Sequence, residues 1–173
     1  MLIIAKWIDA VNQLFGEVLK WAIPVIVSVC ALVAILRYGF DVGFTWMSEI
    51  YVWLNGAVFM LCSAYLLSQD KHVRVDFLYS RLSEKSQAWV NILGTFILLW
   101  PMLFLIADKA WPGIRRSWRI LEQSPSMGGL PFLYLLKTCL IIFCVLLILQ
   151  GLSLVIRSVH VLLNSSKAVK HNG

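Results

Sequence analysis

The sequence predicts an all-α integral membrane protein, with four transmembrane helices preceded by an N-terminal amphipathic interfacial helix. Hydrophobic residues make up 60% of the 173 residues and charged residues only 14%, whereas soluble domains have about 45–50% and about 25%. The mean hydropathy is +0.81, and the charged residues leave long uncharged gaps between them. These observations exclude a soluble globular enzyme, a disordered chain and a disulfide scaffold.

The uncharged gaps locate the spans. About 20 helical residues cross the ~30 Å hydrocarbon core, and all gaps but the first reach this length. The first is shorter, but its apolar face continues upstream. Lys137 lies one turn into the fourth apolar run, and its aliphatic stem can carry the charge to the interface. The predicted spans are about 20–37, 49–69, 86–109 and 131–157. Together they form one membrane domain over 1–173, and we expect a loose tail over 164–173.

Residues 1–20 have the periodicity of a helix with one apolar face. The apolar residues recur at spacings of three and four, and polar residues fill the other face. The apolar set is Ile3, Ile4, Trp7, Ile8, Val11, Leu14, Phe15 and Val18. Such a helix can lie in the headgroup plane, or it can simply extend the first span. We expect Gly16 to let the chain turn into that span, and Pro24 and Pro101 to kink the first and third spans.

Basic residues outnumber acidic ones, and their placement predicts the orientation. The formal net charge is +6. Because basic residues flank the apolar segments, phospholipid headgroups are the expected counter-charge, and nucleic acid is not an expected partner. With four spans, both termini and the middle loop share one side, which holds nine basic residues against six on the other. The difference favours cytoplasmic termini, although the third loop, with Arg115, Arg116 and Arg119, counts against it.

The sequence lacks the patterns that catalysis or metal binding would need. It has no HxxxH, no GxSxG and no glycine-rich phosphate loop. No predicted span carries a carboxylate at mid-depth, where proton or cation coupling usually needs one. We therefore expect no catalytic site, no metal site and no cofactor on this chain. The cysteines all lie in apolar runs without a CxxC pair, which favours small core residues. They are Cys30, Cys62, Cys139 and Cys144.

Polar residues in and beside the spans have structural interpretations. Asn55, Asn91 and Gln150 are expected to pair with neighbouring helices inside the bilayer. Thr45 or Ser48 can cap the second span, with Glu49 near the positive N-terminal end. Arg37, at the end of the first span, is expected to pair with Asp41 or Glu49. Most of the eight tryptophans lie near predicted span ends, as an interfacial belt requires.

Several short motifs occur in a fixed order along this chain. Arg37 closes the first span, and Trp46-Met47-Ser48-Glu49 opens the second. The middle loop carries His72-Val73-Arg74-Val75-Asp76, and Gly128-Gly129-Leu130-Pro131 precedes the fourth span, which contains Gln150-Gly151. With four spans in a chain of this length, this set resembles the small membrane subunit, the Q subunit, of tripartite ATP-independent periplasmic (TRAP) transporters. The resemblance covers roughly residues 5–160. It rests most on Trp46, Glu49, His72, Arg74, Asp76, Gly129 and Pro131.

The resemblance implies a role for the chain. Such transporters pair a periplasmic substrate-binding protein with two membrane subunits in the bacterial inner membrane. The large subunit, of about a dozen spans, carries the substrate and sodium sites and moves as an elevator. The resemblance implies that the small subunit packs against the fixed scaffold of the large subunit and anchors it in the bilayer, and that it has no solute site of its own. The implied function is sodium-coupled, binding-protein-dependent uptake of small organic acids, with this chain as a non-catalytic subunit.

Two further roles stay open at the level of sequence. Arg115, Arg116 and Arg119, with Arg37, form a predicted basic patch that could dock the binding protein or hold lipid phosphate. The chain could also be a self-sufficient four-helix transporter or channel acting as a homo-oligomer, which would need a polar midplane. A quinone-linked membrane enzyme would need paired cysteines or histidines at ligand spacing, which are absent from the sequence.

Overall fold

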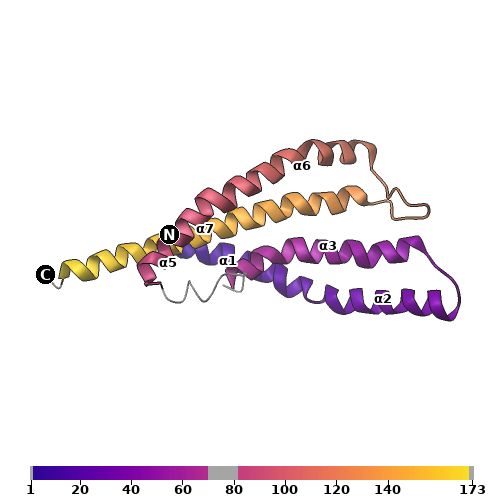
Figure 1. The fold of residues 1–173 in the computed structure, drawn as a ribbon, viewed down its shortest axis with the longest axis horizontal. Helices are drawn as coiled ribbons and strands as arrows, with labels where there is room; N and C mark the ends of the chain where they lie inside the picture. Colours follow the sequence, from indigo (N-terminus) through magenta and orange to yellow (C-terminus); the bar gives the residue numbers. More distant parts are fainter. Residues whose placement is uncertain (1, 70–81, 172–173) are drawn as a thin grey trace.

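The computed structural model describes residues 2–69 and 82–171, with side chains up to residue 163. Every regular element in this part of the chain is a helix (Figure 1). The helices are α1 (Leu2–Leu19), α2 (Ala22–Gly39), α3 (Thr45–Ser68), α5 (Glu84–Gly94), the π-helix η1 (Thr95–Leu99), α6 (Trp100–Ile120) and α7 (Leu133–His171). His72, Arg74 and Asp76, predicted from the middle loop, lie outside the described residues.

Four helical segments in the described ranges are long and apolar enough to cross a membrane. They are Leu2–Gly39, Thr45–Ser68, Glu84–Ile120 and Leu133–Leu163. The predicted fold class, an all-helical membrane protein with four spans, is therefore confirmed. Its physical basis is simple, because a helix satisfies all of its backbone hydrogen bonds internally and apolar side chains tolerate hydrocarbon.

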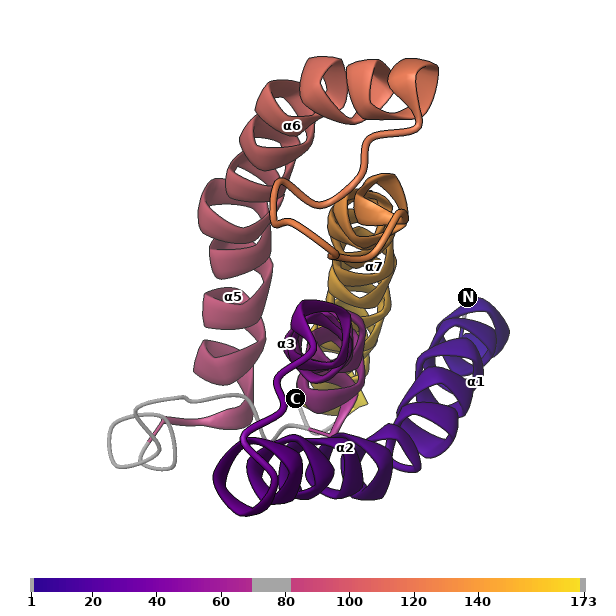
Figure 2. The same cartoon turned by 90° about the vertical axis from the view of Figure 1, so that its right-hand side faces the viewer.

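Helix α7 is the central element of the bundle. It packs against α1, α3, α5 and α6, whereas α2 packs mainly against α3. Seen along the long axis, α7 lies in the middle, with α5 and α6 on one side and α1 on the other (Figure 2). The buried core joins three of these helices through small and aliphatic side chains. Its residues are Ala64, Leu103, Cys144, Leu146 and Leu147. All four cysteines are free thiols, but only Cys144 is buried. Cys62 and Cys139 are half-buried and Cys30 is exposed, so the predicted core role was wrong for Cys30.

The chain turns between α1 and α2 at Lys20–Trp21, and not at Gly16 as predicted. Gly16 is a buried helical position where α1 meets α3. A Cβ added at Gly16 would lie 2.5 Å from Cγ of Tyr65. The absence of a side chain at Gly16 thus allows the Tyr65 ring to lie against the α1 backbone.

The two prolines expected to kink spans act differently from that prediction. Pro24 is the third residue of α2, where a backbone N–H has no partner within the helix, so it breaks no hydrogen bond. Pro101 is the second residue of α6 and follows the π-helical turn η1. There the N–H of Trp100 donates to the carbonyl of Thr95, five residues back, and this wider turn leads the chain into the proline.

The third helical segment is longer than predicted. It continues from the expected end near residue 109 to Ile120, so Arg115, Arg116 and Arg119 lie on a helix and not in a loop. Pro112 lies inside α6, which bends over near its end (Figure 2). The helix stops at Leu121, whose φ of 47° is left-handed, and Glu122 N–H donates to the carbonyl of Ser117. This is a common way for a helix to end.

The fourth helix also differs at its ends. It begins at Leu133 and continues through His171, so residues 164–171 of the expected loose tail are helical. No proline or glycine occurs between Gly151 and His171, and nothing in this stretch therefore forces the helix to stop earlier.

Gly151 provides a test of how closely α7 packs. A Cβ at this position would lie 2.9 Å from Nε1 of Trp100 and 3.0 Å from Cδ2 of Leu99. We expect Gly151→Ala to destabilise the protein by about 1–3 kcal/mol through overpacking, despite the better helix propensity of alanine. The matched control is Gly113→Ala, because nothing lies within 4 Å of a Cβ there. Thermal unfolding in detergent should show a lower midpoint for the first variant only; equal midpoints would contradict the packing.

Candidate functional site

A carboxylate near the start of α3 holds the loop between α6 and α7. Glu49 Oε2 accepts a hydrogen bond of 2.7 Å from the backbone N–H of Leu130, and Oε1 accepts one from the hydroxyl of Ser124. Within the loop, Ser124 N–H donates to the carbonyl of Leu130 at 2.9 Å. Glu49 is the fifth residue of α3, just past the first turn of the helix, so these hydrogen bonds and not the helix end account for its position. We call these residues, with Gly129, the loop cluster.

The loop cluster explains the Gly128-Gly129 pair. A Cβ at Gly129 would lie 2.6 Å from Cβ of Ser124 and 2.7 Å from Oε2 of Glu49, so a side chain there would displace the carboxylate. Gly128 has a φ of +72°, which glycine adopts without strain. Glu49 and Gly129, which the sequence analysis connected only through a resemblance, thus lie in direct contact. Pro131 follows in the same loop, two residues before α7 begins.

The start of α3 differs from the prediction in two respects. The N-cap residue is Phe44 and no side chain caps the helix, so capping by Thr45 or Ser48 was wrong. Glu49 accepts hydrogen bonds from Ser124 and Leu130. Within the described ranges, Arg37 forms an ion pair with neither Glu49 nor Asp41. The predicted pairing of Arg37 was therefore wrong. Trp46, on the same turn, is partly exposed and packs against the ring of Phe44.

A second set of contacts joins the end of α6 to the start of α7. Lys137 Nζ lies 2.6 Å from Oε2 of Glu122 and 3.0 Å from Oγ of Ser117, which is almost fully buried. Trp118 Nε1 donates to Oγ1 of Thr138 at 2.9 Å. Lys137 therefore forms an ion pair with the carboxylate of Glu122. The sequence had predicted only that the aliphatic stem of Lys137 carries its charge to the interface. The hydrogen bonds from Lys137 and Ser117 lower the pKa of Glu122 below its ordinary value.

At the other end of the bundle, polar side chains join α1 to α7. Asp9 Oδ1 accepts hydrogen bonds from Nε2 of Gln150 at 3.0 Å and from Oγ of Ser153 at 2.9 Å, and Oδ2 is paired with Arg157. Asn12 Nδ2 donates to Oε1 of Gln150 at 2.5 Å. We call these residues the termini cluster. Asn12, Gln150 and Ser153 are buried, and their hydrogen bonds satisfy groups that hydrocarbon would penalise. The exception in this cluster is Oδ1 of Asn12, which is buried without a hydrogen-bond partner among the described residues.

Of the termini cluster, the sequence predicted only that Gln150 contacts a neighbouring helix. The other members were missed, although a signal for them is present. Gln150, Ser153 and Arg157 recur at spacings of three and four within an apolar run, so they share one face of α7. A polar stripe on an otherwise apolar span indicates a protein contact. The other predicted amides differ: Asn91 is half-buried on α5, and Asn55 is exposed on α3.

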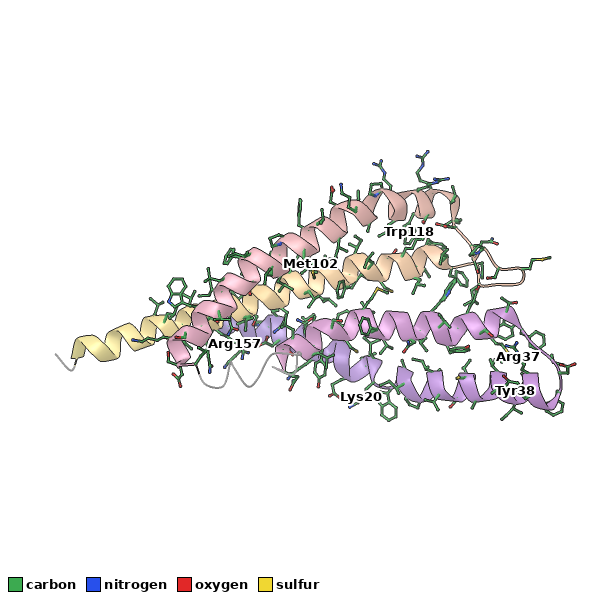
Figure 3. All side chains as sticks on the ribbon, viewed as in Figure 1. Lys20, Arg37, Tyr38, Met102, Trp118 and Arg157 are labelled. Atoms are coloured by element: carbon green, nitrogen blue, oxygen red, sulfur yellow. The ribbon has the colours of Figure 1, made fainter. Side chains whose placement is uncertain are left out.

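The four arginines of the predicted basic patch do not form one surface. Arg115, Arg116 and Arg119, which we call the α6 arginines, line a cavity of about 380 Å³ together with Trp111 and Pro112. Arg37 lies at the end of α2, on the opposite edge of the bundle from α6 (Figures 1 and 3). The structure thus places a basic group on each of two edges.

The acidic, histidine and cysteine side chains of residues 2–69 and 82–163 do not gather into a metal-binding cluster, because no three of them lie together as a metal site would require. The polar contacts described above tie helices to each other at the two ends, and the core between them is apolar. The arrangement therefore positions helices.

Fold and contacts together define a multi-pass membrane protein of the four-span class, whose polar side chains serve helix packing. The comparison with known families identifies it further. The model of the DctQ component of tripartite ATP-independent periplasmic transporters matches residues 25–161. The chain therefore belongs to the DctQ family, the small permease component of these transporters, and the resemblance described from its motifs is confirmed. No curated protein and no solved structure matches it.

The loop cluster can be tested by Glu49→Gln. The amide keeps the size of the side chain but loses the charge that strengthens both hydrogen bonds, so the loop should loosen. We expect the Leu130 amide to exchange with deuterium about tenfold faster. Glu17→Gln is the matched control, because Glu17 is an exposed acid paired only with Lys20. Unchanged exchange at Leu130 would show that Glu49 does not hold the loop.

The lowered pKa of Glu122 predicts a dependence on pH. A carboxyl group that titrates lower in the folded protein than its ordinary 4.5 stabilises the fold above that value, and the contribution disappears as pH falls through the folded pKa. Glu122→Gln should therefore lower the unfolding temperature at pH 7, and the difference from wild type should shrink towards zero as the medium is acidified. A difference that stays constant with pH would contradict the ion pair with Lys137.

Proposed function

We propose that this subunit is the fixed scaffold of a sodium-coupled, binding-protein-dependent importer of small organic acids in the bacterial inner membrane. In this proposal the large membrane subunit, of about 12 spans, carries the sodium and substrate sites, and this chain has no cofactor. Both termini lie in the cytoplasm, which agrees with the greater number of basic residues on that side. An elevator-type transporter moves one domain relative to another, so the second domain has to be held in place.

The observation that carries the proposal is the attachment of α1 to α7. The termini cluster joins the two helices through the shared carboxylate of Asp9. The apolar residues of α1 point elsewhere: Ile3, Ile4, Trp7, Leu14 and Val18 are all exposed. A helix with an exposed apolar row and a polar row on the protein is suited to lie along the membrane surface. Because α1 is tied to the central helix, tilting the bundle would pull that apolar row out of the bilayer.

The scaffold role predicts that cutting this attachment impairs transport without abolishing assembly. Asp9→Ala removes the acceptor shared by Gln150, Ser153 and Arg157, and we expect a loss of about 1–3 kcal/mol in stability. Uptake by the reconstituted three-component transporter should fall by half or more, whereas Glu17→Ala on the same helix should leave it unchanged. Deleting residues 2–16 should have a larger effect. Full uptake by a normally assembled complex lacking residues 2–16 would sink the scaffold role.

We further propose that the α6 arginines and Arg37 contact the periplasmic binding protein. They lie at the end of the bundle opposite the termini, on two edges, and within the described part of the chain none of the four forms a salt bridge. Unpaired guanidinium groups are suited to bind carboxylates of a partner. Two separated basic groups could meet two lobes or two rims of the partner.

Charge reversal tests the docking role. Replacing the three α6 arginines by glutamate should weaken association with the binding protein about tenfold at low salt and should remove most of its salt dependence. Arg37→Glu measures the other edge separately. Lys109→Glu is the control, because Lys109 lies on α6 next to Asp108 and outside the arginine cavity. Association that is equally strong and equally salt-dependent in all variants would exclude docking by these residues.

The alternative of a self-sufficient homo-oligomeric transporter or channel is tested directly. The purified chain is reconstituted into liposomes alone and with its two partner proteins. The scaffold proposal predicts solute uptake only with the partners. Uptake by the chain alone would favour the alternative.

A further inference from the structure

A polar cavity lies beside the termini cluster, where α1, the end of α3 and α7 meet. Its volume is about 320 Å³, at the lower end of the range of about 300–1,000 Å³ for small-molecule sites. The polar lining residues are Lys6, Asp9, Gln13, Ser68, Gln69 and Arg157. Figure 3 shows Arg157 at the end of the bundle away from Arg37. None of the contacts that support the proposed function uses Lys6, Gln13 or Gln69.

The charges in this cavity do not cancel. Among the lining residues that the structure describes, Lys6 and Arg157 supply two positive charges and Asp9 one negative charge, which leaves +1. Asp9 is already paired with Arg157. Lys6 forms no salt bridge within the described residues. The guanidinium of Arg157 has five N–H donors, and the contact with Asp9 leaves some of them available.

The groups around the charge include several donors. Gln13 and Gln69 each bring an amide whose NH₂ group can donate and whose oxygen can accept, and Lys6 brings an ammonium group with three donors. Two cations with neighbouring amide donors suit a phosphate oxygen better than a cation or an apolar ligand. A phosphodiester carries one negative charge and would neutralise the cavity.

The surroundings indicate that such a phosphodiester belongs to a lipid. On α1, Lys6, Asp9 and Gln13 share one side of the helix, and the exposed row with Ile3, Trp7 and Leu14 lies next to it around the helix. The cavity therefore opens beside an apolar surface at a bundle end. A headgroup in the cavity could extend its acyl chains along that surface, which free phosphate cannot do. Basic pockets between membrane helices are known to hold anionic headgroups.

We propose that this cavity binds the headgroup of an anionic phospholipid with a single phosphodiester, of the phosphatidylglycerol type. The lipid lies in the leaflet on the side of the chain termini. By bridging Lys6 of α1 and Arg157 of α7, it strengthens the attachment between these two helices. The inference requires a membrane around the bundle, but it depends neither on the scaffold role nor on docking of the binding protein.

The test uses the full-length chain and measures lipid retention by native mass spectrometry, with melting temperature as a second measurement. Phosphatidylglycerol is compared with zwitterionic phosphatidylcholine and with inorganic phosphate. Lys6→Glu changes the net charge of the cavity from +1 to −1, and Gln13→Trp fills the cavity without changing its charge. Lys85→Glu is the control, because Lys85 is an exposed lysine in the first turn of α5, away from the cavity.

The expected result is selective. Wild type and Lys85→Glu should retain phosphatidylglycerol and gain stability from it, whereas Lys6→Glu should bind it at least about fivefold more weakly, and Gln13→Trp should lose it while remaining folded.

Equal retention by all variants would overturn the proposal. Equal stabilisation by inorganic phosphate would show a free-anion site, which also overturns it. Loss of lipid on assembly, with crosslinks from residue 13 to the large subunit, would show that a protein occupies the cavity. Uptake assays are not needed, so this outcome is independent of the proposed function.

Discussion

A single carboxylate, that of Asp9, receives hydrogen bonds from three side chains of the central helix. This arrangement follows from a constraint that governs the whole bundle. A polar group in hydrocarbon is costly unless another protein group satisfies it. In the described part of the chain the main polar contacts between helices are accordingly gathered at the two ends, and the interior between them holds small and aliphatic side chains. In the residues that the structure describes, the helices are thus tied to each other at the two ends, and the core between them is apolar.

The two ends are joined by one helix. The termini cluster uses Gln150, Ser153 and Arg157 of α7, whereas Lys137 and Thr138, near the start of the same helix, contact the end of α6. Glu49 then attaches α3 to the loop that leads into α7. Displacement at either end would therefore be transmitted along α7.

Neighbouring residues determine some features of this fold, and residues far apart in the chain determine others. The number of spans follows from long apolar runs, which need no tertiary information, and this prediction was correct. Helix ends were less predictable, because the residues after position 109 are compatible with both helix and loop. The pairing of polar residues failed most clearly. Glu49 was expected beside Arg37, yet its partners lie 75 and 81 positions along the chain. Asp9 and Arg157 are 148 positions apart, which no local pattern can connect.

Helix α2 has a property that sets it apart from its neighbours. It contains no buried residue, and it lies against α3 at one margin of the bundle. Its side chains therefore contribute little to whether the rest of the chain folds. Substitutions in this helix can therefore accommodate a different neighbour, lipid or protein, without disturbing a buried core. Sequence drift among relatives should accordingly concentrate on the part of α2 before Arg37, while Arg37 and the spacing of polar residues along α7 are retained.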